Sequence, residues 1–332
     1  MNICIVGATG NVGRKILEVL EQKNFVFDNL FLVASAKSAG KKISFKNKDY
    51  LVSNLEEFDF SKSDITFFSA GGKISEKFIP NASKHSMVID NSSFFRMDPD
   101  VPLIVPQVNP KDLKNVKKNI VANPNCSTAQ MVIALKPLHD KFKIKRIVVS
   151  TYQSVSGAGK APMDELLEQT RQVLDNKKVN SKNFTKQIAF NSIPHIDAFS
   201  EEGYTKEELK MINETKKILD QNINVTATCV RVPVLVSHAE SINIEFENDY
   251  EIDEVRKLLN DADGCTVHDE QKDGGYTTQL EAEGKNETFI SRIRKDNTNE
   301  KALNLWIVSD NLLRGAALNA VEIAEAYIRT KQ

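Results

Sequence analysis

The sequence predicts an α/β fold in which a Rossmann-like N-terminal nucleotide-binding domain is joined to an α+β domain for catalysis and oligomerisation. Two observations carry this prediction. A short apolar strand at 2–6 leads into the glycine-rich segment GATGNVG at 7–13 and then into a helical pattern of apolar residues. Further apolar strands follow at 30–34, 65–69 and 87–90, which is typical of a parallel sheet.

Composition restricts the classes of protein to consider. The 332 residues are 41% hydrophobic and 27% charged, with a net charge of −1, so no electrostatic feature favours a nucleic acid or a membrane as partner. The four cysteines form no CxxC pair, which argues against a zinc site or a disulfide framework, and we expect no bound metal. The chain starts directly with a strand and has no long apolar run, so we expect a reduced, cytoplasmic protein without a signal peptide.

The glycines of GATGNVG have distinct expected roles. Gly7 permits a tight turn, Gly10 lets the backbone approach a pyrophosphate, and Gly13 permits close packing of helix on strand. The following helix supplies amide donors and a favourable dipole for a phosphate. We therefore expect a dinucleotide site here, although a generic glycine-rich turn remains the simpler alternative.

The residues that follow the second strand indicate whether the cofactor is NAD or NADP. An NAD site usually carries an acid there, but here strand 30–34 leads into Ser35, Lys37 and Ser38. One lysine and two hydroxyls suit a 2′-phosphate, which favours NADP. The alternative is that Lys37 is an ordinary loop lysine.

Cys126 is the strongest candidate for covalent chemistry. It lies in the segment Asn123–Thr128, between a Pro/Asn turn and a run that predicts a helix. A thiol at a helix N-terminus is favoured as the thiolate, and lowering its pKa from about 8.5 toward 7 makes it nucleophilic at neutral pH. A nucleophilic thiol and a hydride carrier together suggest redox chemistry at the acyl level through a thioester.

Several polar residues follow predicted strands. Arg96 comes shortly after strand 87–90 and could hold a carboxylate or phosphate, but a single arginine there is more often on the surface. Gln153 ends the strand at 147–152 and could position a substrate by hydrogen bonds, or it could simply be solvated.

Arg231 and His238 belong to one β-branched segment. In a straight strand they would lie roughly 23 Å apart on opposite faces, so they could not share a small substrate. We predict that the chain turns between them, near Pro233 and Ser237. Histidine is the natural acid/base partner of a thiol near neutral pH, although four other histidines compete with His238.

Two further helices are predicted, one around 205–219 and one near the C-terminus. Around 205–219, Glu207 and Lys210 lie on a charged face for which the simplest interpretation is a solvated salt bridge. Residues 312–328 form an apolar amphipathic pattern that must pack against the protein. We assign this helix to the first domain, which then comprises 1–126 plus 312–332, and residues 127–311 to the second.

With these segments assembled, the chain resembles the aspartate-semialdehyde dehydrogenases over essentially its whole length. The matching segments appear in the right order: GATGNVG, ASAKSAG, SSFFRMDPDVPLIVPQVN, ANPNCSTAQM, STYQSVSGAGK, EELKMINETKKIL, CVRVPVLVSHAESI and WIVSDNLLRGAA. The resemblance implies reversible reduction of L-4-aspartyl phosphate, with NADPH, to L-aspartate 4-semialdehyde, NADP and phosphate. It also implies a role in lysine, methionine and threonine biosynthesis, through diaminopimelate for lysine, and at least a homodimer, with a tetramer possible.

The resemblance further implies a role for each matching residue. Cys126 would be the nucleophile, His238 the acid/base catalyst, and Gln153 the residue that orients the acyl group. Arg231 would hold the substrate α-carboxylate and Glu207 its α-amino group, while Arg96 and Lys210 would bind phosphate. The NADP site would comprise Gly7, Thr9, Gly10, Asn11, Val12, Gly13, Ser35, Lys37, Ser38, Ser156, Gly157, Ala158, Gly159, Lys160 and Asn311. Lys160 departs from the pattern, which would place a smaller or apolar residue after SerGlyAlaGly.

Three other functions compete with this interpretation. N-acetyl-γ-glutamyl-phosphate reductase uses the same acyl-phosphate logic on a longer, acetylated substrate, which needs no acid such as Glu207. A catalytically silent paralogue is disfavoured because Cys126, Gln153, Arg231 and His238 are all present. A plain NAD-dependent dehydrogenase of alcohols or hydroxy acids would leave Cys126 unexplained.

Overall fold

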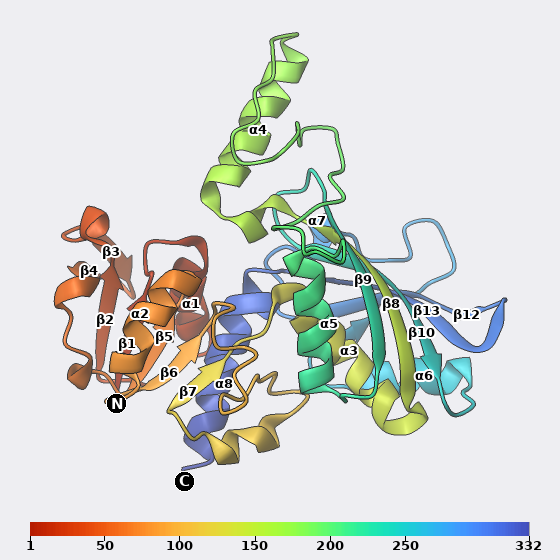
Figure 1. Ribbon diagram of the computed structural model, residues 1–332, viewed down its shortest axis with the longest axis horizontal. Helices are drawn as coiled ribbons and strands as arrows, with labels where there is room; N and C mark the ends of the chain where they lie inside the picture. The colour runs from red at the N-terminus through yellow and green to blue at the C-terminus, as the bar shows by residue number, and fades with distance from the viewer. Residues whose placement is uncertain (332) are drawn as a thin grey trace. The chain divides into compact units, whose positions relative to one another are not determined.

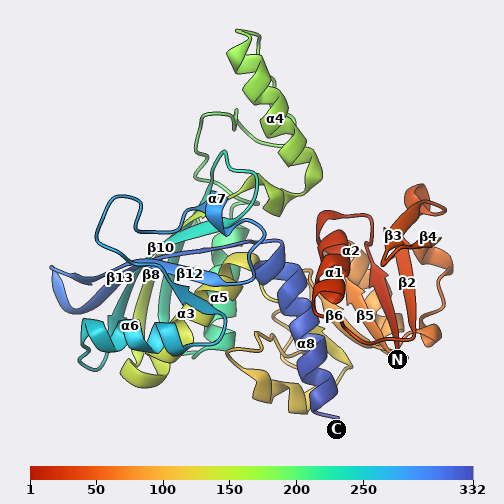
Figure 2. The same cartoon turned by 180° about the vertical axis from the view of Figure 1, so that it is seen from behind.

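The computed structural model describes residues 1–331, which form two compact units. The first unit comprises Met1–Asn125 together with the chain from Ala316 onward, and the second comprises Cys126–Gly315. Figures 1 and 2 show both units from opposite sides. Each unit is built around its own sheet, so the two are described separately.

The first unit is a Rossmann-like α/β unit. Its seven-stranded sheet has the order β3-β4-β2-β1-β5-β6-β7, and every neighbouring pair is parallel except β3 with β4. The strands are β1 (Asn2–Val6), β2 (Asn29–Ala34), β3 (Lys42–Phe45), β4 (Lys48–Asn54), β5 (Ile65–Phe68), β6 (Met87–Asp90) and β7 (Ile120–Ala122). The helices are α1 (Asn11–Gln22), α2 (Gly72–Ala82) and α8 (Leu318–Arg329), with 3-10 turns at Ala36–Ser38, Leu55–Glu57, Phe60–Lys62 and Pro110–Asn115.

The strand order reverses at β1, which has β2 on one side and β5 on the other. In open parallel sheets such a switch point, at the carboxyl ends of the strands, is where ligands bind. The glycine-rich turn follows β1 at this edge, so the fold places GATGNVG where a nucleotide would be expected.

The second unit carries a six-stranded mixed sheet of order β11-β12-β13-β10-β8-β9. β8 runs parallel to β9 and antiparallel to β10, so β8 is the central partner of the two strands that end or begin at Arg231 and His238. The strands are β8 (Ile144–Gln153), β9 (Asn224–Arg231), β10 (His238–Phe246), β11 (Cys265–Val267), β12 (Thr288–Asp296) and β13 (Asn299–Ser309). The helices are α3 (Cys126–Phe142), α4 (Lys160–Leu174), α5 (Lys206–Ile218), α6 (Ile252–Asp261) and α7 (Gln279–Ala282), with a 3-10 turn at Val155–Ala158.

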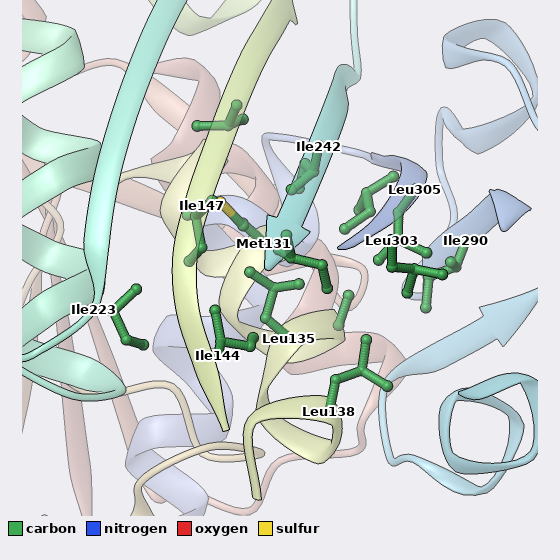
Figure 3. Packing of buried hydrophobic residues seen from close by; sticks show 14 of the residues in the cluster. Met131, Leu135, Leu138, Ile144, Ile147, Ile223, Ile242, Ile290, Leu303 and Leu305 are labelled. Carbon is green, nitrogen blue, oxygen red and sulfur yellow. The ribbon is translucent and has the colours of Figure 1, made fainter. Parts of the chain in front are cut away.

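One face of this sheet is covered by helices and forms the main core. Figure 3 shows Met131, Leu135 and Leu138 of α3 among the branched side chains of the sheet strands. Helix α3 has twelve buried residues along its seventeen, so packing rather than a narrow amphipathic stripe holds it in place. Cys126 lies in the first turn of this buried helix, so tight packing of the helix holds its backbone in place.

The opposite sheet face is only partly covered. Tyr152, Phe289 and Trp306 are partly buried there against Ala239 and Val308, and the Tyr152 and Trp306 rings lie 5.4 Å apart. The short helix α7 adjoins this face and exposes 79% of Leu280. A sheet face with partly exposed aromatic groups beside an exposed leucine is typical of an interaction surface.

Helix α4 projects beyond the sheet, as both ribbon views show, and a long connection to α5 returns beside it. The Lys/Asn-rich connection is pinned to α4 by two buried side chains. The Glu165 carboxylate accepts hydrogen bonds from the backbone N–H groups of Lys182 and Asn183, at 2.9 and 2.7 Å. Gln169 Oε1 accepts from the N–H groups of Ile188 and Ala189.

The segment expected as one helix over 312–328 begins differently from the prediction. A π-helical turn occupies Leu313–Ala317, and the α-helix proper starts at Leu318. The carboxylate of Asp310 caps the turn by accepting from the N–H groups of Leu312 and Leu313, at 2.8 and 3.1 Å. The N–H of Gly315 reaches back five residues to the carbonyl of Asp310, which is the π pattern.

Candidate active site

Three of the residues singled out from the sequence form one transverse row in the second unit. Gln153, at the end of β8, pairs in register with Arg231 of β9 on one side and with His238 of β10 on the other. Residues paired in register point to the same face, so the three side chains lie together on the helix-covered face. All three are at least 93% buried.

The turn predicted between Arg231 and His238 is present. β9 ends at Arg231 and β10 begins at His238, and in between Ser237 takes a left-handed φ of +74°. The turn is held by backbone hydrogen bonds from Val155 N–H to Val234 O (2.9 Å) and from Ser156 N–H to Leu235 O (3.1 Å). The chain thus skips over β8 and returns on its other side, which brings both residues to Gln153.

Cys126 opens helix α3, and two contacts fix the first turns of that helix against the sheet. Gln153 Nε2 donates to Ser127 Oγ at 2.7 Å, and Ser309 Oγ donates to Gln130 Oε1 at 2.8 Å. Gly315 approaches the cysteine so closely that a Cβ on it would lie 2.5 Å from Cys126 Cβ. The turn that carries Cys126 is therefore fixed by hydrogen bonds to the sheet and by close packing against the π-helical turn.

His238 is fully buried and electrically neutral at ordinary pH. Burial first, and then the nearby charge of Arg231, lowers its pKa to about 3. The backbone N–H of Ser154 donates to Nδ1 at 3.1 Å, which assigns the proton of the neutral ring to Nε2. Among residues 1–331, no protein group hydrogen-bonds to Nε2. The ring can therefore offer an Nε2–H donor to a substrate.

The tips of His238 and Arg231 converge above Gly157. A Cβ on that glycine would lie 3.1 Å from His238 Nε2 and 3.2 Å from Arg231 Nη1. Arg231 also donates to the carbonyl oxygen of Ser154 at 2.6 Å. Burial lowers the Arg231 pKa, while Glu207 and Cys126 act in the opposite direction, so the guanidinium lies in the field of both. Only a residue without a side chain leaves room over these two groups.

Glu207 and Lys210 of α5 connect to this row through Gln153. The helix that carries them starts with a capping box between Thr205 and Glu208. Glu207 accepts from Gln153 Nε2 and from Lys210 Nζ, each at 3.0 Å, and Lys210 also pairs with Asp197 at 3.0 Å. Burial alone would lower the pKa of Lys210, but the two carboxylates outweigh it and raise that pKa. The salt bridge expected from spacing is present, but it is bonded to Gln153 and is not an isolated surface pair.

Asn311 connects the loops around the row. Its Oδ1 accepts from the Ser237 N–H (2.9 Å) and from the hydroxyls of Ser154 (3.2 Å) and Ser156 (3.1 Å). Asn311 is only 2% exposed, so its side chain organises these loops from within the unit. Lys160, by contrast, is exposed and pairs with Asp164 on its own helix at 2.8 Å.

Arg96 lies in the first unit and is buried, although a surface position was the more common expectation. Its Nε donates to the carbonyl oxygen of Asn123 at 2.9 Å and its Nη2 to that of Asn91 at 3.0 Å. Asn123, which begins the cysteine segment, also bonds to Asn91 (2.7 Å). Arg96 thus braces the strand end that leads to Cys126.

The residues of the glycine-rich turn fit a dinucleotide. Gly7 has φ +85°, and a Cβ on it would lie 2.3 Å from Ser69 O; a Cβ on Gly13 would lie 2.3 Å from Gly7 O. Gly10 is the N-cap of α1 and has no side chain to cap the helix, and the amides of a helix N-terminus suit a phosphate. Lys37 is exposed on the 3-10 turn that follows β2. These features suit a dinucleotide that carries an additional phosphate.

The described residues contain neither a cluster of metal ligands nor a helix able to span a membrane. Between Met1 and Lys331 no three His, Cys, Asp or Glu side chains are grouped to hold a metal ion. Over the same range, no helix has both the length and the apolar character needed to cross a membrane.

Comparisons with known proteins agree on one family. Residues 2–116 match the family model described as semialdehyde dehydrogenase, NAD binding domain, and residues 135–314 match the one described as semialdehyde dehydrogenase, dimerisation domain. A curated aspartate-semialdehyde dehydrogenase of Aquifex aeolicus is 52% identical, over 98% of each chain.

Solved structures give the same result. The crystal structure of aspartate semialdehyde dehydrogenase II complexed with ASA from Vibrio cholerae superposes with a TM-score of 0.96 at 48% identity, covering 99% of this chain and 98% of that one. A crystal structure of aspartate semialdehyde dehydrogenase with NADP from Candida albicans superposes with a TM-score of 0.74 at 27% identity, covering 98% and 97%.

Proposed function

The chain belongs to the aspartate-semialdehyde dehydrogenase family, and on that premise we propose that it reversibly reduces L-4-aspartyl phosphate to L-aspartate 4-semialdehyde with NADPH. The observation that carries this proposal is the row of Arg231, Gln153 and His238 beside the first turn of α3. In this proposal the row supplies a hydrogen-bond donor and an anion-binding group beside the helix turn that carries the nucleophile.

Cys126 is the proposed nucleophile. Its thiolate would attack the acyl carbon, a C–S bond would form, and the C–O bond to phosphate would break as phosphate leaves with the electron pair. The helix N-terminus favours the thiolate, and the nearby Arg231 charge acts in the same direction. Gln153, bonded to Ser127, would orient the acyl oxygen of the resulting thioester.

His238 is the proposed acid/base residue, and its tautomer defines how it would work. With Nδ1 accepting from Ser154, the Nε2–H would donate to the oxygen that becomes negative when the thioester is reduced. A neutral imidazole can polarise a carbonyl in this way without being an imidazolium. Collapse of the thiohemiacetal would then release the aldehyde and restore the thiolate.

The substrate's polar groups have matching partners. Arg231 would bind the α-carboxylate, and Glu207 would bind the α-amino group. Lys210 and Arg96 are the proposed phosphate ligands, and their positive charges would stabilise the departing anion.

NADP is the proposed cofactor because Lys37 and its neighbouring hydroxyls suit a 2′-phosphate and no acid ends β2. The turn from Gly7 to Gly13 would hold the pyrophosphate, and the segment from Ser156 to Lys160 would complete the site with Asn311. When bound, the nicotinamide would supply or accept the hydride. The NADP named with the Candida albicans relative supports the same choice.

The test is NADPH formation from L-aspartate 4-semialdehyde, NADP and phosphate. We expect activity that depends on phosphate and is lost in Cys126→Ser, while Cys265→Ala retains it. Equal losses in both cysteine variants would contradict the nucleophile assignment. Activity only with the longer, N-acetylated substrate would identify N-acetyl-γ-glutamyl-phosphate reductase, and no activity in folded, NADP-binding protein would identify a silent paralogue.

We also propose a homodimer formed through the sheet face that bears Tyr152 and Trp306, in a cytoplasmic enzyme of lysine, methionine and threonine biosynthesis. The match to a dimerisation domain and the exposed Leu280 beside this face support the interface. Sedimentation velocity should give a dimer for the wild type and a smaller species for Leu280→Asp. An unchanged dimer in the variant would refute this interface.

A further inference from the structure

Glu240 is an acidic residue that the proposed mechanism does not use. It follows His238 by two positions on β10 and therefore points to the same face, where it pairs in register with Thr151 of β8 and Ile307 of β13. Its exposed fraction is 0%. It lies one row beneath the Arg231, Gln153 and His238 row, between that row and the apolar core.

No cation compensates this carboxyl group. Neither of its oxygens has a hydrogen-bond partner within residues 1–331, and Arg231, on the next row, donates to Ser154 O. Burial raises the pKa of Glu240 well above its ordinary value, and the side chain of Gln130 is the group that opposes this rise. Of the titratable groups on the same sheet face, Arg231 and His238 lie one row above Glu240, and Cys229 of β9 lies within its electrostatic reach. A buried carboxyl group without a counter-ion stays protonated.

Gln130 offers the matching partner. It follows Cys126 by four positions on α3 and so lies one turn below the cysteine on the same helix face. Its Oε1 is occupied by the hydroxyl of Ser309, whereas its Nε2 has no partner among the described residues. A primary amide with an unused donor therefore faces an uncharged acid with an unused acceptor.

We propose that Glu240 is a positioning residue that works as an uncharged carboxylic acid, pairing with the Gln130 amide to fix the helix turn that carries Cys126. The acid's carbonyl oxygen accepts from Gln130 Nε2. Because the group is uncharged, it holds the helix without opposing the Cys126 thiolate, whereas a carboxylate in this place would raise the thiol pKa. The inference rests on the proposed role of Cys126.

The test compares Glu240→Gln, which is neutral and keeps polar groups in place, with Glu240→Leu, which removes them. We expect kcat/KM of Glu240→Gln to stay within about threefold of wild type and that of Glu240→Leu to fall by about tenfold, since one buried amide is left unpaired. Thr151→Val, on the same row, is the matched control and should keep wild-type activity. The pH dependence of Cys126 alkylation by iodoacetamide should be unchanged in Glu240→Gln and shifted in Glu240→Leu.

The protonation state can be observed directly. The infrared difference spectrum of wild type minus Glu240→Gln at neutral pH should show the C=O stretch of a protonated carboxylic acid. Carboxylate bands instead, or a lowered Cys126 pKa together with lost activity in Glu240→Gln, would overturn the proposal. Should Glu240→Leu fail to fold, the Gln variant and the infrared measurement still decide. Alkylation and infrared need no substrate, so failure here is separable from failure of the proposed reaction.

Discussion

Gly315 offers a sharp test of how Cys126 is held. A Cβ at this position would lie 2.5 Å from Cys126 Cβ and 2.9 Å from its Cα. Non-bonded carbons prefer separations of about 3.5–4.0 Å, so Gly315→Ala must move the two apart by about 1 Å. A misplacement of about 1 Å at a reacting group can cost about 100-fold in rate, and we expect that loss in kcat/KM.

The same substitution should also change the stability of the protein. At an unobstructed helical position Gly→Ala stabilises a protein by about 1 kcal/mol, whereas an overpacked core loses about 1–3 kcal/mol. We expect Gly315→Ala to lower the free energy of unfolding measured in urea. Gly72→Ala, at the start of α2, is the control, because its Cβ would meet nothing nearer than 4.0 Å. Wild-type kcat/KM and stability in Gly315→Ala would refute the packing argument.

Three other predictions concern charge and burial. The pKa of His238 is about 3 in the folded protein and about 6.5 in the unfolded chain, so the unfolded chain takes up a proton first as the pH falls. Between pH of about 6.5 and 3, the free energy of unfolding of the wild type should therefore fall by about 1.4 kcal/mol per pH unit more than that of His238→Asn. The same pH dependence in both proteins, measured by urea unfolding, would contradict this. Lys37→Ala should raise KM for NADP about tenfold and leave KM for NAD unchanged, since one charge-assisted hydrogen bond is lost; equal changes for both cofactors would count against a 2′-phosphate contact. Burial raises the pKa of Cys229, so iodoacetamide at pH 8 should label Cys126 and spare Cys229, as peptide mapping can check.

Local patterns were enough to predict much of the fold. The strand, glycine turn and helix at the N-terminus are encoded by neighbouring residues. The start of the helix at Cys126 is likewise marked locally, by the Pro/Asn turn that precedes it. Straight-strand geometry also required the turn before His238. In each case a short segment contains the information.

Long-range pairing was beyond such reasoning. Nothing near Gln153 in the sequence states that β8 lies between β9 and β10, or that Asn311 bonds to Ser237 across 74 positions. The π-helical turn at Leu313–Ala317 was also missed, because its cause is Asp310 and the close approach of Gly315 to Cys126. Ser127 was overlooked as well, although a serine directly after the candidate nucleophile was the available signal.

The strand register of the second sheet has a consequence for folding. Arg231, Gln153 and His238 share a face only while three strands keep one alignment. A slip of one residue in β8 would turn Gln153 to the aromatic side and bring Tyr152 inward. Enzymatic activity regained after dilution from denaturant is therefore an assay of strand alignment. Molecules with correct secondary structure but a shifted β8 would be compact and inactive.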